Sequence, residues 1–308
     1  MLDATDVRIF CEMAFRDLSQ GSFADRHVSP SVIGKKLKLD EKTVRVRIKK
    51  MENDGFIKYY QATPSLALFG LSIVRLCRFE AYNIATKYGV LDSVQRMPRV
   101  VEILDYLGPT VAVSIAGRSP ESIQEIVHEI AGRFELSSLD LGDHAIREPQ
   151  VRLDRLDWRI LRGLRYDARI STKDVSKMLS ITPRMTEYRI TKLLESGALS
   201  IRAMLDAQKQ EGLIFYELEM LVNPGEQPGA IRRIAEMHGD RAWSVQTNAG
   251  VLLVSLFAFN LGEPEEVAMA SMKIEGVKHC SLFILKQSVE PRRPSWIDGF
   301  IEEKIGST

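Results

Sequence analysis

The stretch that decides the fold is Asp40-Glu41-Lys42-Thr43-Val44-Arg45-Val46-Arg47-Ile48-Lys49-Lys50-Met51, followed four residues later by Gly55. Its apolar residues recur at steps of four and three, as on one face of a helix: Val44, Ile48 and Met51. Asp40 is a good N-cap, and Gly55 suits the left-handed end of a helix. The stretch therefore predicts an amphipathic helix over residues 41–53 with a basic outer face.

Further helices and a strand are predicted on either side of this helix. Ser29 and Pro30 suit the N-cap and first position of a helix over residues 30–37. An amphipathic helix is expected over residues 5–18, and the alternation over residues 56–60 predicts one strand of a wing. This order is typical of a winged helix-turn-helix, whose last helix enters the major groove of DNA.

The same pattern recurs later in the chain. Arg189-Ile190 and Gly197 repeat Arg47-Ile48 and Gly55 at a constant separation of 142 positions. The second copy has an expected helix over residues 154–166, a second capped by Ser171, and a third that starts at Thr182. Self-similarity at a fixed period indicates two copies of one module in the chain. Such a pair imitates the two-fold symmetric dimers that bind paired half-sites.

A second repeated unit follows each winged helix. In the first half, strands are expected over residues 71–79, 100–106, 110–116 and 136–141, with helices over 83–96 and 120–132. In the second half, strands are expected over 213–222, 241–247, 251–259 and 277–286, with helices over 227–238 and 264–274. The order β-α-β-β-α-β is that of a ferredoxin-like sandwich. The helices of each sandwich pack on one face of its sheet and leave the other face uncovered. We therefore expect the two sandwiches to pair through these faces within the chain.

These units define the expected fold class and domains. The fold class is α+β, with two winged helix-turn-helix domains that are each followed by a ferredoxin-like βαββαβ sandwich. We expect winged helices over residues 1–64 and 149–208, and sandwiches over residues 65–148 and 209–288. Residues 289–308 should form a tail with a short helix that packs on the sandwich or docks on another protomer.

Composition sets limits on location and cofactors. Hydrophobic residues make up 45% and charged residues 27% of the 308 positions, as in ordinary globular proteins. No apolar run reaches the ~18 residues of a membrane span, and the first residues lack the basic region of a signal peptide. Three scattered cysteines, Cys11, Cys77 and Cys280, suit neither a disulfide framework nor a zinc site. We expect a cytoplasmic protein with no membrane partner, metal or cofactor.

Positive charge is concentrated in the two winged helices although the net charge is only +1. Residues 28–60 hold nine Lys/Arg against four acids, and residues 151–210 hold thirteen against seven. The expected DNA contacts in the first copy are Ser31, Lys42, Thr43, Arg45, Val46, Lys49, Lys50 and Lys58. Those in the second copy are Arg184, Met185, Tyr188 and Lys192. The second copy should bind more weakly, because Glu187 replaces Arg45 and Thr186 replaces Val44.

The signature over residues 29–33 and 40–57 resembles that of the Lrp/AsnC (feast/famine) family of prokaryotic transcription factors. The resemblance covers nearly the whole chain, with one family unit in each half. The chain therefore resembles a tandem duplication of that unit. The resemblance implies a transcriptional regulator with double-stranded DNA as its partner and a tendency to form homo-oligomers. A winged helix kept only for docking or scaffolding is the alternative, since a fold alone does not fix function.

The family also suggests a small-molecule effector. Its sandwich commonly carries Gly-x-x-Asp between the second and third strands, whereas this chain has Gly108-Pro109-Thr110-Val111 and Ala249-Gly250-Val251-Leu252. The missing Asp removes a counter-charge for an ammonium group, which argues against an amino-acid effector. Candidate effector residues are Tyr106, Gly108, Thr110, Thr247, Asn248 and Gly250. The alternative is that these are ordinary turn residues.

An enzyme is the competing interpretation. The two-module architecture also resembles that of siroheme decarboxylases, which pair related subunits around a tetrapyrrole and would need His and Arg in an apolar pocket. The five histidines have no metal-ligand spacing and no counterpart between the halves: His27, His128, His144, His238 and His279. No catalytic triad pattern or phosphate-binding Gly loop is present. We therefore expect no enzymatic activity, with a tetrapyrrole enzyme and a non-DNA-binding scaffold as the alternatives.

Overall fold

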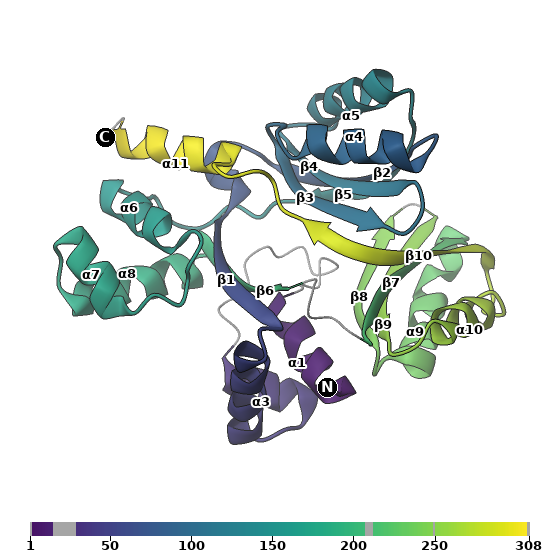
Figure 1. Ribbon diagram of the computed structural model, residues 1–308, viewed down its shortest axis with the longest axis horizontal. Coiled ribbons are helices and arrows are strands. Elements are labelled where there is room, and N and C mark those ends of the chain that lie inside the picture. Colours follow the sequence, from purple (N-terminus) through teal and green to yellow (C-terminus); the bar gives the residue numbers. More distant parts are fainter. Residues whose placement is uncertain (1, 15–28, 207–211, 249, 307–308) are drawn as a thin grey trace.

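Two three-helix units, here called head 1 and head 2, project from the protein, head 1 at the bottom and head 2 at the left of Figure 1. The computed structural model describes residues 2–14, 29–206, 212–248 and 250–306. Head 1 consists of α1 (Ala4–Ala14), α2 (Pro30–Leu37) and α3 (Glu41–Asn53). Head 2 consists of α6 (Arg155–Leu164), α7 (Thr172–Leu179) and α8 (Pro183–Glu195). The part of the first expected helix after Ala14 lies outside the described residues.

Side-chain caps explain where these helices begin. Asp40 accepts a hydrogen bond from the Thr43 backbone N–H at 2.8 Å, and Ser29 caps α2 in the same way. In head 2, Ser171 and Thr182 are the corresponding N-caps. Each cap satisfies a backbone donor that the first turn of a helix leaves unpaired. Gly55 and Gly197 follow α3 and α8 with φ of 72° and 76°, in the left-handed region.

The strand after each head pairs with the strand from the other half. β1 (Ile57–Pro64) and β6 (Leu199–Leu205) run antiparallel, with Ile57 opposite Leu205 and Pro64 opposite Leu199. We call this two-stranded sheet the ribbon. The expected wing strand after head 1 is therefore present, but its partner comes from about 140 residues away in the sequence. The ribbon joins the two heads.

Each half then forms a βαββαβ unit, so the predicted α+β fold class is confirmed. The first unit contains β2 (Ile73–Glu80), α4 (Ile84–Val94), β3 (Val100–Tyr106), β4 (Thr110–Gly117), α5 (Pro120–Phe134) and β5 (Ser137–Ala145). The second contains β7 (Ile214–Val222), α9 (Gln227–His238), β8 (Ala242–Asn248), β9 (Val251–Ala258), α10 (Gly262–Ser271) and β10 (Val277–Val289). Short 3-10 helices, η2 (Leu66–Phe69) and η4 (Pro224–Glu226), precede β2 and α9.

The two units share one eight-stranded sheet, ordered β5-β2-β4-β3-β10-β7-β9-β8. β10 is the strand that joins them: it pairs with β7 up to Leu285 and with β3 from Leu285 to Val289. This strand is longer than the sequence predicts, and its last residues form the junction. The sheet curves so that apolar residues of both units meet on its inner face: Leu76, Tyr106, Ala112, Leu141 and Leu253.

The C-terminal helix, α11 (Trp296–Gly306), packs mainly on head 2, whereas we expected it on the sandwich. Its first residue, Trp296, does contact the first sandwich, where its indole N–H donates to the Val100 carbonyl at 2.8 Å. Ile297, Ile301 and Ile305 recur every four residues and are buried against the apolar face of α6. Arg165 at the end of α6 pairs with Asp298 at 3.2 Å. The helix follows the apolar surface that α6 leaves uncovered. No helix in the described part of the chain is long and apolar enough to cross a membrane.

Candidate nucleic-acid interface

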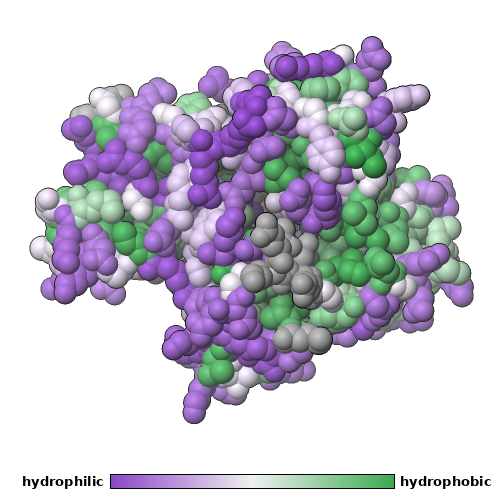
Figure 2. Space-filling model, viewed as in Figure 1, coloured by the Kyte–Doolittle hydropathy of each residue, from purple (hydrophilic) through white to green (hydrophobic). Residues whose placement is uncertain are grey.

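The outer face of α3 is a short basic stripe. Its exposed residues are spaced by three, one and three positions and lie on one side of the helix: Lys42, Arg45, Val46 and Lys49. The opposite side carries the buried residues that anchor α3 in head 1: Val44, Ile48 and Met51. Head 1 forms the lower lobe of Figure 2, whose visible surface is mostly hydrophilic. We call the four exposed residues the α3 stripe.

Some of the predicted DNA contacts already have partners within head 1. The Thr43 hydroxyl donates to the Asp40 carboxylate and so belongs to the N-cap of α3. Lys50 lies 3.5 Å from Asp6 of α1 and is 47% exposed, at the edge of the α3 stripe. Arg45 pairs with Glu41 one turn earlier, but both side chains are about half exposed, at 62% and 46%. Surface ion pairs of this kind are worth ~0–1 kcal/mol, so Arg45 can exchange Glu41 for a phosphate or a base.

Arg47 fixes the orientation of α3. Its Nη1 atom lies 2.7 Å from Oδ1 of Asp6, which is buried, and 2.8 Å from Oδ2 of Asp3. Hydrogen bonds to Asp3 and Asp6 raise the pKa of the Arg47 guanidinium. The pair ties α3 to the start of α1, so it positions the α3 stripe without being part of it.

Head 2 repeats this arrangement. Nη1 of Arg189 lies 2.8 Å from the buried Asp157 and 2.7 Å from Asp154. This role of Arg47 and Arg189 was not predicted from the sequence, although the two residues occupy matching positions of the repeat. The signal was available: Asp3 and Asp6 recur as Asp154 and Asp157, each at the start of the first helix of its head.

The outer face of α8 has a different chemistry. Arg184, Glu187 and Thr191 stand where α3 has Lys42, Arg45 and Lys49, so three cations are replaced by one cation and one anion. The predicted contacts Met185 and Tyr188 are 44% and 64% exposed, and Lys192 is exposed too. Thr186 is fully buried at the position of Val44, with its hydroxyl donated to the Thr182 carbonyl at 3.1 Å. Head 2 therefore keeps the fold but loses most of the positive stripe.

The remaining predicted DNA contacts lie beside the stripe. Ser31 is half-buried in the first turn of α2, and Lys58 is exposed on β1 of the ribbon. The structure thus groups Lys42, Arg45, Val46 and Lys49 on one surface and leaves Ser31 and Lys58 at its sides. DNA contact by each of these residues remains a prediction.

The predicted effector residues fall into two separate turns. Tyr106, Gly108 and Thr110 lie at the β3–β4 turn, whose backbone carbonyls at Tyr106 and Gly108 accept hydrogen bonds from the buried Lys87 ammonium. Thr110 donates to Glu80 at 2.9 Å, and the Tyr106 hydroxyl donates to Glu217. The second group lies at the β8–β9 turn: Thr247, Asn248 and Gly250. The polar groups of the first turn are therefore already used within the protein.

Family models match both heads. An AsnC-type helix-turn-helix domain matches residues 153–194, and a winged helix-turn-helix DNA-binding domain matches residues 24–58. The chain is 28% identical over 138 residues to an uncharacterised HTH-type transcriptional regulator from Pyrococcus furiosus. That alignment covers 43% of this chain and 91% of the relative. A similar regulator from Pyrococcus abyssi is 24% identical over 141 residues, which cover 44% of this chain and 87% of the relative.

The fold is also similar to a solved structure over its whole length. The siroheme decarboxylase NirDL aligns with a TM-score of 0.56 at 15% identity, covering 98% of this chain and 99% of that protein. At this identity the comparison shows a shared fold. Each of these two relatives aligns with about half of this chain. Within the chain, each of the two helix-turn-helix matches is followed by a βαββαβ unit. The chain thus carries an AsnC-type helix-turn-helix domain in its second half and resembles two regulators of the Lrp/AsnC type joined in tandem.

Proposed function

We propose that this protein is a transcriptional regulator that binds double-stranded DNA chiefly through head 1. The observation that supports this most strongly is the α3 stripe, in which Lys42, Arg45 and Lys49 are exposed on one face of the helix. A helix in the major groove can use Arg to bind guanine through two hydrogen bonds, and Lys to contact phosphates or guanine. Val46, 61% exposed at the centre of the stripe, offers an apolar contact to a thymine methyl group.

We further propose that both heads contact the same DNA duplex. The ribbon connects head 1 to head 2, and the shared sheet connects the two sandwiches, so the distance between the heads is set within one chain. Head 2 contributes phosphate contacts through Arg184 and Lys192, which are exposed on α8. Homo-oligomers of such chains would present several pairs of heads to neighbouring DNA sites.

The experiment is a fluorescence anisotropy titration of labelled duplex DNA at several salt concentrations. Each phosphate contact adds about −0.9 to the slope of log affinity against log salt, so affinity should fall steeply as salt rises. The triple variant Lys42→Ala/Arg45→Ala/Lys49→Ala should bind far more weakly and with a shallower slope. Arg232→Ala/Lys273→Ala/Lys278→Ala removes three exposed cations of the second sandwich and is the matched control.

The proposal fails if the wild-type protein does not bind at low salt. It also fails if the two triple variants lose the same affinity, because the loss would then reflect net charge alone. A protein that keeps its fold but binds no DNA would be a docking or scaffolding module.

The second candidate function is tetrapyrrole decarboxylation, supported by the whole-length fold shared with NirDL. The two functions differ in a simple measurement, the absorbance spectrum of iron-uroporphyrin III during titration with the purified protein. A DNA-binding regulator should leave the spectrum unchanged. A saturable spectral change at one tetrapyrrole per chain would favour the enzyme.

A further inference from the structure

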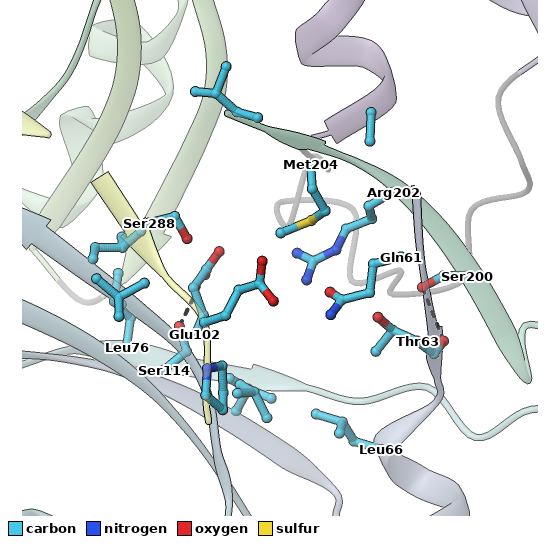
Figure 3. Close-up of a pocket in the computed structure, with 18 of the residues that line it drawn as sticks. Gln61, Thr63, Leu66, Leu76, Glu102, Ser114, Ser200, Arg202, Met204 and Ser288 are labelled. Carbon is cyan, nitrogen blue, oxygen red and sulfur yellow. Dashed lines mark hydrogen bonds between the residues drawn. The ribbon is translucent and has the colours of Figure 1, made fainter. Parts of the chain in front are cut away.

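A cavity of about 240 Å³ lies between the ribbon and the inner face of the shared sheet, away from the α3 stripe. Figure 3 shows Gln61, Arg202 and Met204 projecting into it from the ribbon, and Glu102 projecting from the sheet opposite. Apolar side chains complete the walls, among them Leu66, Val74, Leu76 and Leu104. Both halves of the chain therefore contribute to one cavity.

Several polar atoms that line this cavity lack a hydrogen-bond partner within the described part of the chain. They are the hydroxyl oxygens of Thr63, Ser65 and Ser244 and the Nε2 atom of His144. Ser65 and Ser244 are only 7% and 4% exposed. Leaving a buried polar group unpaired costs ~1–3 kcal/mol, so native proteins rarely group several of them without a purpose. A polar ligand in the cavity would satisfy them.

Two charged side chains that line the cavity also lack an ion-pair partner among the described residues. Arg165 pairs with Asp298, Glu290 pairs with Arg293, and Glu217 accepts hydrogen bonds from Tyr106 and Ser255. By contrast, Arg202 forms no ion pair among the described residues, and Glu102 accepts only a 3.4 Å hydrogen bond from Ser114. One unpaired cation on the ribbon therefore faces one unpaired carboxylate on the sheet (Figure 3).

We propose that this cavity binds a small organic acid whose other end carries an amine or a hydroxyl group. The carboxylate of such a ligand would bind Arg202 and Gln61, and its donor end would bind Glu102. Its apolar body would contact Leu66, Leu76 and Leu104 between these two ends. A polycarboxylate fits less well, because Glu102 and Glu290 line the cavity and would repel it.

His144 suits a neutral part of such a ligand. Burial lowers the pKa of its imidazole, so the ring is uncharged at pH 7. Its free Nε2 can then donate or accept one hydrogen bond, depending on the tautomer. The structure places His144 in the cavity wall.

The test uses matched probes with one aromatic body and the full chain, measured by isothermal titration calorimetry without DNA. 3-(4-Hydroxyphenyl)propionate carries both ends, 3-phenylpropionate only the acid, and 4-ethylphenol only the hydroxyl. We expect the first to bind at least about tenfold more tightly than either of the others, the ratio that one additional charge-assisted hydrogen bond supplies. 3-(4-Aminomethylphenyl)propionate then distinguishes an amine from a hydroxyl at the Glu102 end.

Substitutions identify the protein residue that binds each end of the ligand. Arg202→Met should weaken every acid probe about tenfold or more, and Glu102→Gln should remove the advantage of the donor end. Arg202→Lys keeps the charge and should retain part of the affinity, which keeps the test decisive if Arg202→Met does not fold. Arg232→Met removes an exposed cation of α9 and is the control.

The proposal is overturned if no probe binds the wild-type protein, or if a folded Arg202→Met variant and Glu102→Gln bind all probes as the wild type does. If Arg202→Met does not fold, full wild-type affinity of Arg202→Lys for the acid probes, together with that of Glu102→Gln, overturns it. Because the measurement contains no DNA, its failure is independent of the proposed DNA-binding function.

Discussion

Arg45 and Arg184 are the residues that separate the two heads most directly. Arg45 lies in a stripe of three cations, whereas Arg184 lies near Glu187, which repels phosphates. Arg45→Ala should cost about 1–3 kcal/mol of DNA-binding free energy if Arg45 binds guanine through two hydrogen bonds. Arg184→Ala should cost less. Anisotropy titrations of the two single variants check this, and a larger loss from Arg184→Ala would reverse the assignment.

A second residue-scale prediction concerns Glu217, which is buried on the inner face of the sheet. Burial raises the pKa of its carboxyl from the ordinary value of 4.5 to about 7. Between these values the folded protein holds a proton that the unfolded chain has released, so the contribution of this carboxyl to stability falls as the pH rises from 4.5 to about 7 and stays at its lowest above that pH. Glu217→Gln removes the titration and can still accept the hydrogen bond from Ser255.

We therefore expect Glu217→Gln to change stability little at pH 4.5 and to raise it by roughly 1–3 kcal/mol at pH 8 relative to the wild type. Urea unfolding at both pH values measures the difference. An identical effect of the substitution at pH 4.5 and pH 8 would contradict the proposed protonation.

At the scale of elements, the pairs Arg47–Asp6 and Arg189–Asp157 offer a matched test of how each head is used. Both substitutions, Arg47→Met and Arg189→Met, leave a buried Asp without its main partner and should each lower stability by about 1–3 kcal/mol. Their effects on DNA should differ, because only α3 carries the basic stripe. Arg47→Met should weaken binding several-fold more than Arg189→Met; equal losses from the two variants would count against a dominant head 1.

The ribbon supports a further element-scale prediction. Thr63 and Ser200 lie opposite each other, two residues from the hydrogen bond that the Ser65 N–H donates to the Ala198 carbonyl, so they form a hydrogen-bonded pair of the β1–β6 ladder. Proline at Ser200 would remove one backbone donor from this pair. Ser200→Pro should therefore loosen the connection between the heads and reduce DNA affinity. Native-state hydrogen exchange of residues 57–64 and 199–205 reports the loosening. Unchanged protection of both strands in Ser200→Pro would show that the ribbon does not depend on this pairing.

The local elements could be predicted from the sequence because their signals are local. Asp40 and Thr182 mark helix starts, and Gly55 and Gly197 mark the ends. The partners of strands could not be predicted in the same way, because pairing depends on residues far apart. β1 alternates as a wing strand should, yet nothing within residues 56–60 specifies β6 as its neighbour. For the same reason the tail helix was expected on the sandwich but packs mainly on α6.

The same distinction between local and long-range signals applies to the candidate site. The exposed face of α3 follows from helical periodicity alone, so the sequence identifies Lys42, Arg45 and Lys49. The partners of Arg47 lie more than forty positions away, at Asp3 and Asp6. The cavity depends on Arg202 and Glu102, which only the ribbon and the curved sheet bring to face each other. A single sequence carries no local pattern for such pairs.

At the scale of the whole molecule, the two heads are built alike, joined within one chain and different in charge. A duplex that both heads contact should therefore present two unequal half-sites, about one helical turn or a multiple apart. The preferred DNA site should be an imperfect palindrome, with one half-site conserved more strongly than the other. Strict two-fold symmetry of the preferred site would contradict unequal heads.

Selection from a pool of random duplexes, followed by sequencing of the bound fraction, tests the central claim most directly. The wild-type protein should enrich one motif with a strong and a weak half-site. The Lys42→Ala/Arg45→Ala/Lys49→Ala variant should lose the strong half-site, while the control triple Arg232→Ala/Lys273→Ala/Lys278→Ala should enrich the same motif as the wild type. A wild-type selection that enriches no motif would contradict sequence-specific DNA binding by this protein.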